Sequence, residues 1–142
     1  MRRTIQMALF LLVLPVFFFA LGSKGEAKEM EVDVDDLLKG IDVDVDVSIP
    51  DQDSVLWLSK SNKYDFEITK LRPEPNAPKQ PFYRTAFISS SKRRRVSSGP
   101  PNSDQPWGNV PTSGYWTYKS TIDVWENGKF VKTIDPHIRV HP

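Results

Sequence analysis

Residues 114–142, GYWTYKSTIDVWENGKFVKTIDPHIRVHP, contain two runs of alternating polar and apolar side chains that meet at Asn127 and Gly128. Alternation with a period of two is typical of a β-strand with one buried face. Asn-Gly is the preferred pair for a two-residue type I′ turn, because both central residues of that turn need a positive φ. The stretch therefore predicts a β-hairpin, followed by a short last strand at residues 137–141 after the Asp-Pro break.

A two-residue loop at Asn127 and Gly128 fixes which side chains of the hairpin face one another. The predicted pairs are Glu126 with Lys129, Trp125 with Phe130, Val124 with Val131, Asp123 with Lys132 and Ile122 with Thr133. Such facing pairs of opposite charge or of apolar character stabilise an antiparallel ladder by about 0.2–1 kcal/mol each. The expected core face carries Trp116, Tyr118, Ile122, Val124 and Val131.

Further strands are expected before the hairpin, at residues 55–59, 64–69 and 82–88. Four prolines in residues 72–81 indicate a loop without ladder hydrogen bonds. The many Ser, Pro, Gly and Asn residues of 89–113 predict a long exposed loop. Strand after strand with little helical periodicity predicts an all-β fold, an antiparallel β-sandwich over residues 54–142.

The C-terminal third also carries a family resemblance. Its residues are Tyr115-Trp116-Thr117-Tyr118-Lys119, then Ile122-Asp123-Val124, Asn127-Gly128 and Ile134-Asp135-Pro136-His137-Ile138-Arg139-Val140. This order resembles the last strands of small immunoglobulin-like or cupredoxin-like sandwiches in exported bacterial proteins. The sequence lacks the cysteine pair of antibody domains and the copper ligands of cupredoxins. The resemblance therefore implies a fold and no function.

The segment of residues 23–53 is strongly acidic. From Glu26 to Asp53 it has eleven acidic and two basic residues, whereas residues 54–142 have seven acidic and fourteen basic ones. Within it, residues 41–49 alternate strictly between apolar and polar side chains, which predicts a strand that ends at Pro50. A shorter alternation at residues 32–35 predicts a related strand beside a turn or one helical turn.

One face of the predicted strand at residues 41–49 carries Asp42, Asp44 and Asp46. Their spacing matches the opening of a calcium loop, but Val47 and Asp53 stand where an EF-hand needs glycine and glutamate. Three alternatives remain: a solvated acidic face, a face that docks on basic residues of this or another chain, and a cation site. We take this face as an expected contact region.

The first residues predict export. A basic start at residues 1–3 precedes an apolar run at residues 5–21, which is the pattern of a signal peptide over residues 1–22. Small residues place cleavage before Ser23 or Lys28; the alternative is an uncleaved membrane anchor. The expected location is secreted or periplasmic. With no cysteine, the chain has no disulfide, thiolate metal site or thiol nucleophile.

A basic cluster, Lys92-Arg93-Arg94-Arg95, lies in the predicted long loop and is the expected anion-binding region. Docking on the acidic strand of the same chain and simple solvation are the alternatives. The two histidines, His137 and His141, would lie about 13 Å apart on a strand, too far to share a metal ion. We expect no metal and no cofactor.

The sequence contains four tryptophans, a residue type whose ring can stack on a ligand. Trp57 and Trp116 occupy positions of the alternating runs and are expected in the core. Trp107 lies in a Pro-Trp-Gly-Asn loop, and Trp125 with Phe130 lies on the outer face of the hairpin. These three side chains are the expected ligand contacts.

No motif of a nucleophilic, phosphate-binding or metal-dependent enzyme occurs in the sequence. We therefore expect an exported, noncatalytic binding module that recognises a protein or cell-surface partner, including a polyanionic glycan, and not a nucleic acid. Membrane contact is expected only through residues 5–21, if they are retained. The alternative is a β-sandwich that binds a carbohydrate or another small ligand through its exposed tryptophans.

Overall fold

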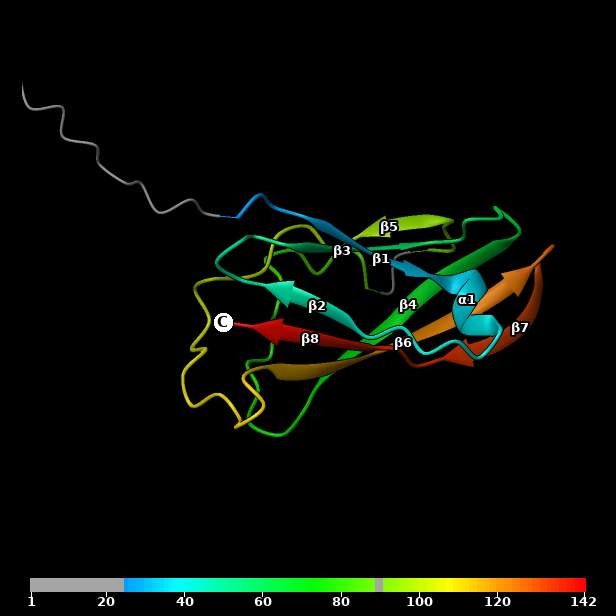
Figure 1. Ribbon diagram of the computed structural model, residues 1–142. Helices are drawn as coiled ribbons and strands as arrows, with labels where there is room; N and C mark the ends of the chain where they lie inside the picture. The colour runs from blue at the N-terminus through cyan, green and yellow to red at the C-terminus, as the bar shows by residue number, and fades with distance from the viewer. Residues whose placement is uncertain (1–24, 89–90) are drawn as a thin grey trace, which may run out of the picture.

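The computed structural model describes residues 25–88 and 91–142 and contains, over those residues, one short helix and eight strands (Figure 1). In chain order the elements are β1 (Glu29–Asp33), α1 (Val34–Leu38), β2 (Val45–Ser48), β3 (Ser54–Leu58), β4 (Tyr64–Pro73), β5 (Arg95–Ser97), β6 (Trp116–Glu126), β7 (Lys129–Ile134) and β8 (His137–His141). One sheet has the order β1-β3-β5, and the other has β2-β8-β6-β4 with β7 also paired to β6. The two sheets pack against each other, which confirms the all-β sandwich.

The strand directions are mixed. β1 pairs with β3 in parallel, and β2 pairs with β8 in parallel, whereas the pairings of β4, β7 and β8 with β6 and of β5 with β3 are antiparallel. The acidic N-terminal segment thus contributes one strand to each sheet, and both of its pairings are parallel. The antiparallel sandwich predicted for residues 54–142 is confirmed, since all pairings between the strands of that stretch are antiparallel. The two parallel pairings each involve a strand of residues 23–53, whose direction the sequence did not predict because alternation specifies a strand's faces and not its direction.

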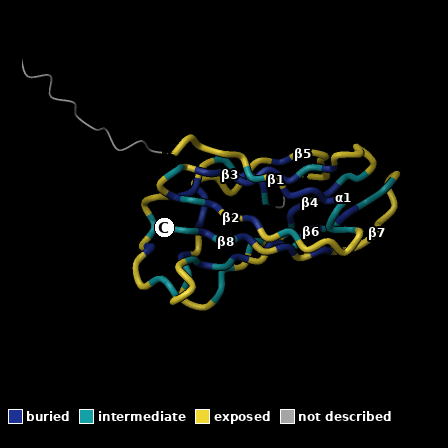
Figure 2. The backbone as a smooth tube through the Cα atoms, viewed as in Figure 1, coloured by how far each residue is buried: buried dark blue, intermediate teal, exposed yellow. Residues whose placement is uncertain are grey.

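The core lies between the two sheets. Figure 2 shows buried residues along the strands of both sheets, with exposed residues mainly in the connecting loops. Trp57 of β3 and Tyr118 of β6 are fully buried, together with Phe66 of β4 and Ile138 of β8. Each such side chain stabilises the fold by about 1.5–3 kcal/mol relative to an exposed position. Trp57 and Trp116 are buried as predicted.

The hairpin forms around the predicted turn, with φ values of 50° at Asn127 and 77° at Gly128. Its first two facing pairs are those predicted, but a bulge follows between Val124 and Trp125. Val131 is the extra residue of β7 and is 44% exposed, so its assignment to the core is wrong. The bulge shifts the register so that Ile122 faces Ile134 in place of Thr133, and Ile134 is buried.

Residues 82–88 form no regular strand, contrary to the prediction. Phe82 and Phe87 are both buried and their rings lie 5.9 Å apart, edge to face. An odd spacing of five would place them on opposite faces of a strand, so the chain must turn between them to bury both. It does so at Thr85, whose carbonyl accepts a 3.0 Å hydrogen bond from the Ile88 backbone N–H.

Two predicted loops also have different bounds in the structure. β4 continues through Pro73, into the stretch predicted as a proline-rich loop. β5 lies inside the predicted long loop of residues 89–113 and pairs with β3, with Val96 facing Trp57. Ser98 is fully buried, and its hydroxyl accepts a 2.9 Å hydrogen bond from the Val55 N–H. A three-residue strand with one apolar side chain is too short to produce a detectable alternation.

Asp53 ties the two N-terminal strands together. Its buried carboxylate accepts hydrogen bonds from the backbone N–H of Lys28, just before β1, at 2.9 Å and from that of Ser48, the last residue of β2, at 3.1 Å. Because β1 and β2 belong to different sheets, one side chain fixes the edge of each sheet relative to the other.

We expect Asp53→Asn to lower the free energy of unfolding by about 1.5–3 kcal/mol, because one of two charge-assisted acceptors becomes a donor. Urea unfolding followed by tryptophan fluorescence measures the loss. Asp104→Asn is the control, because it makes the same change on an exposed loop residue whose carboxylate forms no hydrogen bond with the described residues. Its free energy of unfolding should stay within about 0.5 kcal/mol of the wild-type value. Equal unfolding midpoints for both variants would remove the proposed role of Asp53.

Candidate functional site

The side chains of the basic cluster, residues 92–95, point to different sides of the chain where it enters β5. Arg94 turns to the side of β4, where its Nε lies 3.0 Å from Asp65 Oδ1. Lys92 lies over the ring of Trp125, with 4.3 Å between Nζ and the ring centroid. The Arg93 backbone exchanges two hydrogen bonds with Phe66, of 2.8 and 2.9 Å. The cluster is therefore not one loose loop, and only part of it remains open to a partner.

Arg93 and Arg95 line a groove of about 270 Å³ together with Arg84. The remaining lining comes from the side chains of Ala86, Phe87, Val96 and Ser97. We call this the arginine groove. Arg84 was not among the residues predicted from sequence, because it belongs to the segment expected to form a strand and precedes the basic cluster by several residues. The structure brings it beside β5 through the turn at residues 85–88.

Aromatic contacts anchor the segment of residues 82–87, which carries Arg84, against the core. Phe87 stacks on Trp57 of β3 with 5.4 Å between ring centroids and an interplanar angle of 21°, and the edge of Phe82 packs on Phe87. The stem of Arg84 passes over Gly99, where a Cβ atom would lie only 3.1 Å from Arg84 Cδ. Gly99 also has a φ of 68°, which disfavours a side chain at that position.

The groove is electrostatically unbalanced. Arg95 Nη2 lies 3.4 Å from Glu29 Oε1, and the Ser97 hydroxyl donates a 3.5 Å hydrogen bond to the other oxygen of that carboxylate. Among the described residues, no carboxylate lies within ion-pair distance of Arg84 or Arg93. Of the three guanidinium groups, only that of Arg95 thus has a carboxylate partner among the described residues. Guanidinium forks bind carboxylate, phosphate and sulfate oxygens in a planar, two-point geometry, so this arrangement suits an anion.

The aromatic ligand contacts predicted from sequence are not brought together. Trp107 is only 9% exposed and its Nε1–H donates a 2.8 Å hydrogen bond to the Asn102 carbonyl, so the expectation that its ring is exposed is wrong. The glycine and prolines around it form a loop that folds its ring inward. Trp125 and Phe130 contact each other edge to face at 5.9 Å, and Phe130 is 58% exposed. One face of Trp125 is already occupied by Lys92.

The predicted acidic face is largely engaged within the chain. Asp44 pairs with Arg139 and lies 4.0 Å from His137, and Asp46 lies 2.7 Å from Nε2 of His141. Of the three alternatives, docking on basic residues of the same chain holds for these two carboxylates, and the partners lie on β8 and not in the basic cluster. Asp42 has no ion pair with any described residue. No group of three metal-ligating side chains occurs among residues 25–88 and 91–142.

The expected export signal, residues 1–22, lies outside the described residues. No helix in the described part of the chain is long and apolar enough to cross a membrane. No protein-family model, curated protein sequence or solved structure matches this chain.

Proposed function

We propose that this protein is an exported, noncatalytic binding module that holds an anionic surface partner, such as a polyanionic glycan, in the arginine groove. The observation that carries the proposal is the presence of Arg84 and Arg93, without carboxylate partners, beside Arg95 in one hollow. Like charges gathered in one groove repel each other, and an anion that binds there relieves this repulsion. The apolar walls formed by Phe87 and Val96 lower the local dielectric and strengthen that attraction.

The donor set of the groove supports binding rather than catalysis. Arginine stays protonated at all physiological pH values, so none of the three guanidinium groups can act as a general base. The hydroxyl of Ser97 donates to Glu29. Such a groove holds and orients an anion without transferring a proton or forming a covalent bond.

The expected export supports a partner outside the cytoplasm. The apolar run at residues 5–21 is the pattern on which this part of the proposal rests. Surfaces outside the cytoplasm present sulfated, phosphorylated or carboxylated polymers rather than nucleic acids as their common polyanions. A module with an arginine groove and no thiol suits such an environment.

Calorimetric titration with a heparin dodecasaccharide tests the groove. We expect Arg84→Gln and Arg93→Gln each to weaken binding about five- to tenfold, since each removes a charge-assisted contact. Arg94→Gln removes the same charge from a side chain paired with Asp65 outside the groove, and should change affinity less than about twofold. Binding that survives about 1 M salt, where the screening length is about 3 Å, would contradict the electrostatic account, as would equal effects of all three variants.

Export is tested by the intact mass of the natively expressed protein in separated soluble, membrane and secreted fractions. We expect a mass that begins at Ser23 or Lys28 outside the cytoplasm, because small residues precede both positions. A full-length mass in the membrane fraction would instead make residues 5–21 an anchor. A full-length mass in the cytoplasm would contradict export altogether.

A further inference from the structure

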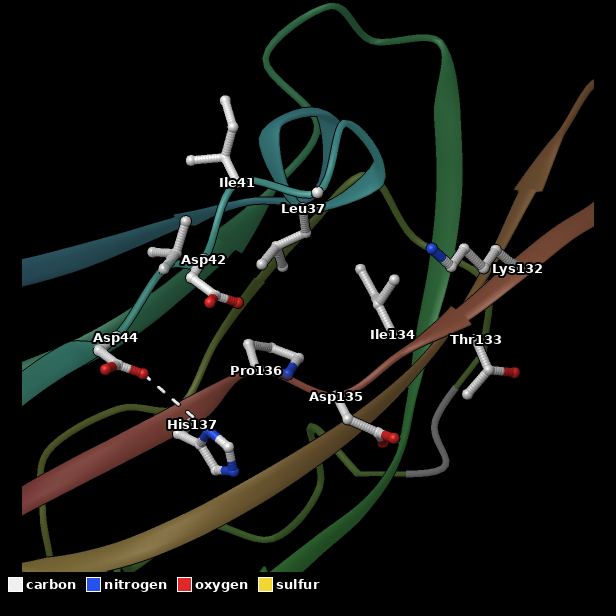
Figure 3. Close-up of a pocket in the computed structure, with 12 residues that line it drawn as sticks. Leu37, Ile41, Asp42, Asp44, Lys132, Thr133, Ile134, Asp135, Pro136 and His137 are labelled. Carbon is white, nitrogen blue, oxygen red and sulfur yellow. Dashed lines mark ion pairs between the residues drawn. The ribbon is translucent and has the colours of Figure 1, made fainter.

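A second groove lies on the other sheet, where β2 separates from the strands beside it (Figure 3). Its volume is about 300 Å³, at the lower end of the range of pockets that hold small organic ligands. One wall is the chain from Leu37 to Asp44, and the other is residues 132–137 of β7 and β8. We call this the β2–β7 groove.

The groove exists because the parallel ladder between β2 and β8 stops at Val45, which pairs with Ile138. Continuing that register would place Val43 opposite Pro136, which has no N–H to donate. The next pair would be Asp42 opposite Asp135, and two carboxylates in that position repel each other. The chain before Val45 therefore leaves the sheet, and the predicted strand of residues 41–49 is shortened to β2 (Val45–Ser48).

The floor of the β2–β7 groove is apolar. Leu37, Val43, Ile134 and Pro136 line it, and Ile134 is buried against the core. Ile41 stands at the rim with half of its surface exposed, although the alternation predicted it on the buried face of a strand. The floor offers contacts for an apolar group of a few carbon atoms.

Two charged side chains of opposite sign extend into the groove from opposite walls, Asp42 from the chain before β2 and Lys132 from β7 (Figure 3). Neither has an ion pair or hydrogen bond with another side chain among the described residues. Because they stand on different walls, a bound molecule can contact both at once only by bridging the groove.

The other polar side chains of the lining already have partners. Asp44 pairs with Arg139 on β8 and lies 4.0 Å from Nδ1 of His137, which also lines the groove (Figure 3). Asp135 pairs with Lys119 at 3.3 Å; its partial burial favours the neutral form, but the nearby Thr121 hydroxyl and the Lys119 ammonium outweigh this and keep the pKa of Asp135 below its ordinary value. The hydroxyl of Thr133 donates to Asp123 at 2.6 Å. Asp42 and Lys132 are thus the charges left to recognise a ligand.

From this arrangement we infer that the β2–β7 groove binds a small zwitterion, a free amino acid with an apolar side chain. Its ammonium group pairs with the Asp42 carboxylate, its carboxylate pairs with the Lys132 ammonium, and its side chain rests on Leu37, Ile134 and Pro136. This site lies apart from the arginine groove and shares no residue with it. The inference does not depend on the proposed function.

Titration of the ¹⁵N-labelled protein with L-leucine, followed by backbone amide shifts at low ionic strength, tests the inference. We expect saturable shifts confined to residues 37–44 and 132–137 at leucine concentrations up to about 10 mM. Leucinamide lacks the carboxylate and N-acetylleucine lacks the ammonium, so each should bind about fivefold more weakly than leucine. Leucyl-leucine, with its charges farther apart, should also bind more weakly; tighter binding of the dipeptide would overturn a single amino acid as the ligand.

Substitutions of Asp42 and Lys132 test which charged group of the ligand each of these side chains contacts. In Asp42→Asn the ammonium group loses its partner, so leucine and N-acetylleucine should bind equally; in Lys132→Gln leucine and leucinamide should bind equally. Asp104→Asn and Lys129→Gln make the same charge changes at exposed positions outside the groove and should leave leucine binding unchanged. The inference is overturned if leucine shifts no groove amide in the wild-type protein. It is also overturned if leucine, leucinamide and N-acetylleucine bind to the wild-type protein with equal affinity.

Discussion

The stacking of Phe87 on Trp57 is the contact on which the surface of the first sheet depends. Trp57 lies on β3, the middle strand of that sheet, and is fully buried. Phe87 covers Trp57 and belongs to residues 82–88, which form no regular strand. The turn that allows this contact also places Arg84 beside β5. The same contact therefore packs the core and determines where a surface arginine lies. This explains why the arginine groove forms at an irregular part of the fold.

Both grooves lie where a regular ladder ends. The arginine groove borders β5, which pairs with β3 over only three residues. The β2–β7 groove opens where Pro136 stops the ladder between β2 and β8 and divides the last part of the chain into β7 and β8. Backbone and side chains that would be covered by a neighbouring strand remain accessible at such points. In this sandwich the breaks in pairing provide the hollows, and the sheets provide the rigidity around them.

The parts of the fold that the sequence predicts are those with local determinants. The hairpin turn follows from Asn127 and Gly128 alone, and its first two pairs are as expected. The bulge at Val131 was not predictable, because it depends on burying Ile134 against a core assembled from distant strands. The parallel pairing of β2 with β8 and the approach of Arg84 to Arg93 are likewise long-range. Trp107 was misplaced because a loop composition of Pro, Gly and Asn does not reveal that a tryptophan folds inward.

The central claim is that Arg84, Arg93 and Arg95 act as one anion site while Arg94, from the same basic cluster, does not. Observing the four guanidinium Nε–H signals by NMR while sodium sulfate is added at constant ionic strength tests it most directly. The account predicts that the signals of Arg84, Arg93 and Arg95 shift along one saturation curve and that the signal of Arg94, paired with Asp65, stays in place. Equal, unsaturated shifts of all four signals, or a stationary Arg84, would contradict it.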